Sequence, residues 1–149
     1  MPFQNAPAPL AQALAARGFE APTSVQAAIL ADDAKGRDLL VSARTGSGKT
    51  VAFGLSLADT LLNGADRCGP SDAPLALVIA PTRELALQVR SELEWLYAKT
   101  GARIVSCVGG MEPRTEARHL SAGCHIVVGT PGRLCDHLKR GNLDLSQLK

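Results

Sequence analysis

The sequence predicts an α/β fold, in which a mainly parallel sheet carries helices on both faces. Four short apolar runs, at residues 38–42, 75–80, 103–108 and 125–128, have the length and composition of buried strands. A segment with helical spacing of apolar residues follows each run, and this alternation is typical of parallel sheets. The distinctive short motifs all follow strand ends. We therefore expect them at one edge of the sheet, where ligands bind in such folds.

The bulk properties describe one ordinary domain of 149 residues with an aliphatic core. No run of 18 apolar residues occurs, so no membrane span is predicted, and the amino terminus lacks the pattern of a signal peptide. A net charge of +2 is too small to indicate nucleic-acid binding by itself. The four cysteines and three histidines lack metal-ligand spacing. We interpret them as core or surface residues of a protein in a reducing cytoplasm.

The amino-terminal region predicts a helix near residues 10–17 and a second helix from Thr23 to about residue 31. Thr23 and Gln26 have the spacing of a capping box, in which each side chain bonds the backbone of the other. A second interpretation uses the carboxamide of Gln26 to match the amino group and N7 of adenine. The local sequence favours the cap, and both interpretations stay open.

Residues 43–50 read Ala-Arg-Thr-Gly-Ser-Gly-Lys-Thr and stand between the run at 38–42 and a helical pattern. Backbone N–H groups around Gly46 and Gly48 can cradle phosphate oxygens at the positive end of the new helix. Lys49 would reach the β- and γ-phosphates, and the Thr50 hydroxyl would ligate Mg2+. A plain glycine-rich turn is the alternative, but Gly-Lys-Thr at the start of a helix is a specific phosphate-binding signal.

The next segments predict a helix over residues 51–62, apolar nearly all round and packed between layers, and an exposed loop at 64–74. The run at 75–80 reads as a strand buried on both faces, and Thr82 then caps a helix. On that helix and just after it, we expect Trp95 and Tyr97 to be partly buried rather than to stack on bases.

The last third of the sequence repeats this arrangement twice. Gly109 and Gly110 follow the run at 103–108 and precede a polar helix over residues 113–121. After the run at 125–128, Thr130 is the expected N-cap of a final helix that ends near residue 140. Proline stands at the first position of both helices, where its missing N–H costs nothing.

In their order, these motifs resemble those of the DEAD-box RNA helicases, particularly bacterial members. Phe19 together with residues 22–26 resembles the Q motif, with Phe3 as its upstream aromatic residue. Further matches are residues 43–50 to motif I, 81–86 to motif Ia, 109–110 to the GG doublet, and 130–133 to motif Ib.

The resemblance implies a RecA-like P-loop NTPase domain, with a Q-motif region at 1–34, a partial ATP-binding domain at 35–149, and no second RecA-like domain. It implies ATP and Mg2+ as cofactors, and RNA as a partner bound through its backbone without base reading. The implied nucleotide-binding residues are Phe19, Gln26, Arg44, Thr45, Gly46, Ser47, Gly48, Lys49 and Thr50, with Lys49 and Thr50 catalytic and Thr50 a metal ligand. The implied RNA-binding residues are Pro81, Thr82, Arg83, Gly109, Gly110, Thr130, Pro131, Gly132 and Arg133.

The resemblance further implies that the full-length protein couples ATP binding and hydrolysis to local RNA unwinding. The Asp-Glu-Ala-Asp tetrad, which positions Mg2+ and the attacking water in that family, does not occur in this sequence. Phosphoryl transfer needs both functions, so we expect the chain alone to bind nucleotide and to hydrolyse it negligibly. We also expect an incomplete sheet, whose exposed apolar edge favours self-association.

Two other functional classes stay open. The chain alone could amount to a non-catalytic RNA-binding module that is gated by nucleotide, or it could belong to another P-loop ATPase such as a DNA helicase. A dinucleotide-binding Rossmann domain is disfavoured, because no Gly-x-Gly-x-x-Gly follows the first predicted strand.

Overall fold

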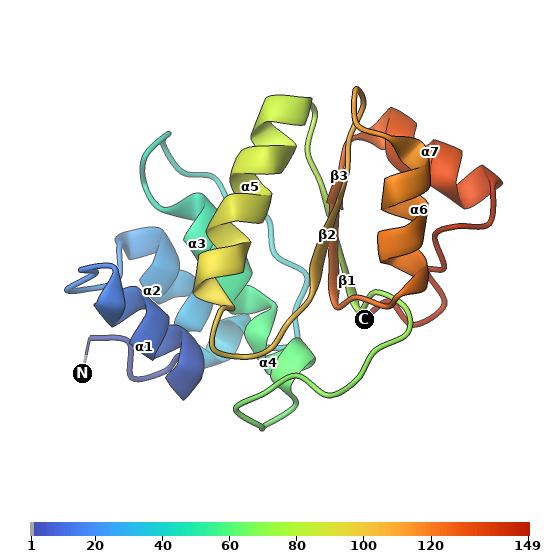
Figure 1. The fold of residues 1–149 in the computed structure, drawn as a ribbon. Helices are drawn as coiled ribbons and strands as arrows, with labels where there is room; N and C mark the ends of the chain where they lie inside the picture. Colours follow the sequence, from blue (N-terminus) through green and yellow to red (C-terminus); the bar gives the residue numbers. More distant parts are fainter. Residues whose placement is uncertain (1) are drawn as a thin grey trace.

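The computed structural model describes residues 2–149 and has the α/β architecture that the sequence predicts (Figure 1). A parallel sheet lies between two groups of helices. The sheet consists of β1 (Ala76–Ile79), β2 (Ile104–Cys107) and β3 (Ile126–Gly129), in the order β1-β3-β2. Both neighbours pair with β3 in parallel along its whole length.

The helices match the expected segments with small shifts at their ends, except that the one expected over residues 51–62 is two helices separated at Leu57. Their bounds are Ala8–Ala16 for α1, Ser24–Leu30 for α2, Lys49–Ser56 for α3, Ala58–Leu62 for α4, Arg83–Leu96 for α5, Pro113–Ser121 for α6 and Pro131–Lys139 for α7, with a 3-10 turn at Asp32–Ala34. Among the helices of residues 2–149, none has the length and apolarity to cross a membrane.

Side chains of β3 alternate between two hydrophobic cores, as successive residues of a strand must. Ile126 and Val128 pack into the larger core with residues of α1, α3 and α5. Val127 packs into the smaller core, with Leu120 of α6 and Leu134 of α7. The two helical layers of Figure 1 therefore correspond to two cores on opposite faces of one sheet.

The strand expected at residues 38–42 is absent from the described residues, which corrects the sequence prediction. This segment is irregular, Leu40 is fully exposed, and Leu39 and Val41 are also exposed. A strand needs a neighbour to satisfy its backbone N–H and C=O groups, and no strand of residues 2–149 pairs with this segment. An apolar run alone did not suffice to predict a strand here.

The prediction that residues 75–80 are buried on both faces is also wrong in part. Ile79 is 61% exposed, and Leu77 and Val78 are half-buried. The reason is that β1 pairs with β3 on one side only and so forms an edge of the sheet. The open edge of β1 and the exposed segment around Leu40 leave apolar side chains in contact with solvent.

The packing of α3 against α5 depends on Gly54 and Tyr97. A Cβ atom at Gly54 would lie 2.7 Å from Leu96 Cδ2 and 3.0 Å from Leu93 Cδ2, both on α5. Tyr97 is fully buried rather than partly buried as expected, and its hydroxyl donates to the Gly54 carbonyl oxygen at 2.6 Å. Burial raises the pKa of Tyr97 far above its usual value, so the phenol stays a hydrogen-bond donor.

Trp95 is half-buried, as the sequence analysis expected. Its ring packs against Phe19 with centroids 5.7 Å apart, and the Arg17 guanidinium lies 4.8 Å from the centroid. These contacts hold the segment before α2 against α5.

Gly54→Ala is predicted to destabilise the protein by about 1–3 kcal/mol, the usual cost of overpacking, even though alanine favours helices. Chemical denaturation measures this free energy of unfolding. Gly132→Ala is the matched control on α7, because a Cβ atom there meets nothing within 4 Å. Equal effects of the two substitutions would contradict close packing as the cause.

Candidate functional site

The glycine-rich loop at residues 43–48 leads directly into α3, as the sequence predicts. Gly46 and Gly48 have φ values of 80° and 84°, in the left-handed region that favours glycine. Lys49 is the first residue of α3, and its Nζ donates to the Ala43 carbonyl oxygen at 2.7 Å. The lysine thus closes its own loop by bonding a neutral oxygen, and a phosphate would offer it a stronger, charged acceptor.

Ser47 supplies a specific sign that this loop accommodates a ligand. Its Oγ is the one buried side-chain nitrogen or oxygen of residues 2–149 that has no hydrogen-bond partner. Buried polar groups are nearly always paired, so an orphaned hydroxyl in a glycine-rich loop indicates a missing polar partner. Phosphate oxygens fit this position, because the hydroxyl, the backbone N–H groups and the start of α3 all favour an anion.

Gln26 makes the capping box that the sequence predicts and one further contact. Its backbone N–H donates to Thr23 Oγ1 at 3.4 Å, and its Oε1 accepts from the Thr23 backbone N–H at 3.0 Å. Its Nε2 also donates to the Gly48 carbonyl oxygen at 3.3 Å. Gln26 is fully buried, and a Cβ atom at Gly48 would lie 2.3 Å from Nε2. The cap therefore joins α2 to the phosphate-binding loop, and the carboxamide keeps one unused N–H.

A groove of about 820 Å³ opens beside this loop. It is within the size range of small-molecule sites. Its lining includes Phe19, Gln26, Thr45, Gly46, Gly48, Lys49 and Thr50, together with residues at the carboxyl end of β1. Arg44 is exposed, and Ser47 is half-buried with its Oγ buried. Seven of the nine candidate nucleotide residues thus line one groove, and Arg44 and Ser47 belong to the same loop.

A second cluster lies at the carboxyl end of β2, around the turn of residues 109–111. A Cβ atom at Gly110, whose φ is 80°, would lie 2.5 Å from Arg83 Nη1. Arg83 Nη2 lies 3.8 Å from Met111 Sδ, and Arg133 Nη1 donates to the Met111 carbonyl oxygen at 3.1 Å. The structure therefore brings together the arginines of residues 81–86 and 130–133 around the glycine pair.

The helix starts next to this turn differ in their caps. Thr82 Oγ1 accepts from the Leu85 backbone N–H at 3.2 Å, so the predicted cap of α5 is confirmed. Thr130 is the N-cap residue of α7, as predicted, but its side chain makes no capping hydrogen bond. The hydroxyl does not reach the amides of the first turn, and Pro131 has no N–H. The amides of Gly132 and Arg133 are thus left without a side-chain cap, a state suited to an anion.

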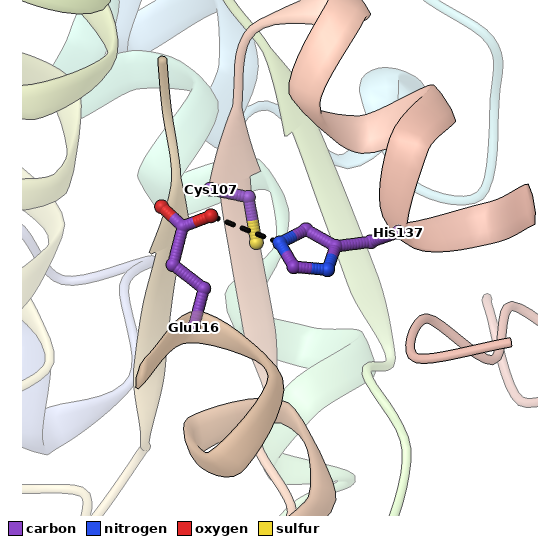
Figure 2. Close-up of side chains that lie close together, drawn as sticks. All are labelled: Cys107, Glu116 and His137. Atoms are coloured by element: carbon purple, nitrogen blue, oxygen red, sulfur yellow. Dashed lines mark hydrogen bonds and ion pairs between the residues drawn. The ribbon is translucent and has the colours of Figure 1, made fainter. Parts of the chain in front are cut away.

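Two residues that the sequence analysis did not assign to a site lie beneath this turn. The buried carboxylate of Glu116 accepts from the Val108 backbone N–H, Arg133 Nη1 and His137 Nε2, each at 2.9 Å (Figure 2 shows the contact with His137). His137, which we had interpreted as core or surface filler, is fully buried. These partners are separated by 8, 17 and 21 residues from Glu116, so no local sequence pattern could have revealed them.

Comparison with known proteins assigns the family. A family model described as DEAD/DEAH box helicase matches residues 23–149. The chain is 48% identical over 142 residues to ATP-dependent RNA helicase DeaD of Klebsiella pneumoniae, covering 95% of this chain and 21% of that protein. It is 42% identical over 142 residues to DEAD-box ATP-dependent RNA helicase 53 of Oryza sativa subsp. japonica, covering 94% of this chain and 23% of that protein. It thus spans about a fifth of the length of these relatives.

Solved structures give the same result. A DEAD box protein from the hyperthermophile Methanococcus jannaschii superposes with a TM-score of 0.84 at 34% identity, over 99% of this chain and 39% of that one. The yeast DEAD-box splicing factor Prp28 superposes with a TM-score of 0.82 at 31% identity, over 98% of this chain and 36% of that one. The glycine-rich loop, the order of the motifs and these matches agree: the chain belongs to the DEAD/DEAH box helicase family.

Proposed function

We propose that this chain is the ATP- and RNA-binding part of an ATP-dependent RNA helicase that couples ATP binding and hydrolysis to local RNA unwinding. The observation that carries the proposal is the unpartnered, buried hydroxyl of Ser47 in a glycine-rich loop that Lys49 closes. The relatives are described as ATP-dependent RNA helicases, which agrees with this function. We also propose a cytoplasmic location, in keeping with cysteines that are free thiols.

In this proposal, the loop of residues 44–48 holds the phosphates of ATP through its backbone amides. Lys49 exchanges the Ala43 carbonyl oxygen for phosphate oxygens, and Thr50 ligates Mg2+. The metal would neutralise charge on the phosphates during transfer. Phe19 packs against the base, and Gln26 bonds adenine with the one N–H and the one lone pair that its bonds to Thr23 and Gly48 leave unused.

RNA would bind at the second cluster through its sugar–phosphate backbone. Pro81, Thr82 and Arg83 begin one helix, Gly109 and Gly110 form the turn, and Thr130, Pro131, Gly132 and Arg133 begin another. The uncapped amides of α7 and the Arg83 guanidinium are suited to phosphate, and neither reads a base. Binding without base contacts agrees with the modest net charge of +2, because few phosphates need to be neutralised.

For the chain alone, we propose nucleotide binding with negligible hydrolysis. Glu92 of α5 is the one carboxylate among the residues that line the nucleotide groove, which leaves metal and water without the pair of carboxylates that hydrolysis needs. The same observation favours a second candidate, a non-catalytic RNA-binding module gated by nucleotide. RNA affinity measured with and without a non-hydrolysable ATP analogue separates the two: the second candidate requires a difference, and an unchanged affinity excludes it.

Lys49→Ala is expected to weaken binding of Mg-ATP by about 10- to 100-fold, since a charge-assisted hydrogen bond contributes about 1.5–3 kcal/mol. Isothermal titration calorimetry measures the affinity. Lys99→Ala, at an exposed lysine that does not line the groove, is the control and should bind as the wild type does. Equal affinities for all three proteins would refute the nucleotide site, and RNA-stimulated hydrolysis by the chain alone would refute its inactivity.

Gln26→Ala tests whether Gln26 selects the base or only caps α2. We expect the preference for ATP over GTP to fall and the free energy of unfolding to drop by about 1–2 kcal/mol, because two partly buried hydrogen bonds are lost. Thr23→Ala removes the cap but keeps the carboxamide, so it should lower stability without altering base preference. A stability loss in Gln26→Ala with unchanged base preference would show that Gln26 only caps α2 and does not select the base.

We further propose self-association through the open edge of β1, where Ile79 is exposed and lines the same groove as Val41. Light scattering should give a mass that rises with protein concentration. Ile79→Lys should weaken this association about tenfold, equivalent to about 1.4 kcal/mol. Leu138→Lys, at an exposed leucine of α7, serves as the control. A constant monomer mass at high concentration would contradict the proposal.

A further inference from the structure

Glu116 lies at the centre of a closed hydrogen-bond network beneath the turn of residues 109–111. Its side chain is 5% exposed, and that of Arg133 is 15% exposed. Oε2 accepts from the Val108 backbone N–H, and Oε1 accepts from Arg133 Nη1 and contacts His137 Nε2. Asn142 Nδ2 lies 3.2 Å from His137 Nδ1 and donates to it, which leaves the ring proton on Nε2, facing Glu116. Three donors therefore converge on one buried carboxylate.

The same place offers a possible metal site, because Cys107, Glu116 and His137 present ligand atoms within 4.8 Å of one another (Figure 2). Two features disfavour that interpretation. Burial, reinforced by the Glu116 carboxylate, raises the pKa of the Cys107 thiol to about 12, whereas a metal needs the thiolate. The Arg133 guanidinium already compensates the carboxylate, and a cation would have to displace it. The cluster is explained as a hydrogen-bond network.

The network connects two segments of the proposed RNA site. Val108 directly precedes the glycine pair, so its bond to Glu116 fixes the start of the turn. Arg133 Nη1 bonds both Glu116 and the Met111 carbonyl oxygen, so it fixes the end of the same turn and is itself held from below. We propose that Glu116 is a positioning residue for RNA binding, which holds this turn and Arg133 in one arrangement. This inference rests on the proposed RNA-binding function.

The direction of the effect of Glu116→Gln separates positioning from simple charge. Removing a negative charge near a phosphate-binding surface should strengthen the attraction of RNA. Loss of positioning has the opposite effect. A carboxamide has one oxygen, so its NH2 group would face either the Val108 N–H or the Arg133 guanidinium, and one of those donors would lose its acceptor. The positioning role therefore predicts weaker RNA binding in a protein that has become more positive.

We test this with the protein and a fluorescent single-stranded RNA at fixed salt. Glu116→Gln should weaken RNA binding about tenfold, the effect of misplacing one phosphate contact, and leave Mg-ATP affinity unchanged. Asp136→Asn, which removes a more exposed carboxylate from α7, should bind RNA as well as the wild type or slightly better. RNA affinity of Glu116→Gln equal to or above that of the wild type overturns the inference. A wild type that does not bind RNA overturns the proposed function instead, and the inference with it.

A second measurement tests the inference even where the Glu116→Gln protein does not fold. Arg133→Gln removes the other half of the network, and amide hydrogen exchange at residues 109–111 should rise while exchange in β1 stays as in the wild type. Unchanged exchange in the turn overturns the inference. Where both variants fold, the double variant should bind RNA no less tightly than the single variant with the lower RNA affinity, because both substitutions break the same connection. Additive losses would show independent roles and also overturn it.

Discussion

Backbone pairing along β3 is the constraint on which the sheet and the candidate RNA site depend. β3 is hydrogen-bonded on both sides and entirely buried, and β1 and β2 are strands only because they pair with it. Since all three strands run parallel, their carboxyl ends meet at one edge. The starts of α5 and α7 and the turn of residues 109–111 all follow those ends. The position of each candidate RNA residue is therefore a consequence of pairing within the sheet.

The same constraint explains where sequence-based prediction succeeded and failed. Residues 75–80, 103–108 and 125–128 became strands because they pair with one another, and the helices between them followed from apolar spacing. Residues 38–42 also contain an apolar run, Leu39 to Val41, but have no partner among residues 2–149, so they remain irregular. Composition predicts the tendency of a segment to form a strand, whereas the partner decides the outcome. The exposure of Ile79 has the same origin, because β1 lacks a second neighbour.

Within the sites, residues carried by a contiguous motif could be predicted, and residues that act across the fold could not. The glycines at 46 and 48 and the capping box of Thr23 and Gln26 are local patterns, and the structure contains them. The bond from Gln26 to Gly48 spans 22 residues, and the bonds to Glu116 join α6, α7 and the residue that follows β2. Such contacts depend on which helices pack over which strand ends, information that a single sequence carries only through the complete fold.

The helix α5 gives the two candidate sites a common rigid support. Its first residue, Arg83, lies over the glycine turn, and Val89 and Glu92 line the nucleotide groove. Its C-terminal half packs on α3, the helix that begins at Lys49, with no space for a side chain at Gly54. A displacement of α3 would therefore press directly on α5, because a close-packed contact transmits displacement rather than absorbing it. The two sites are thus joined through helix packing as well as through the edge of the sheet.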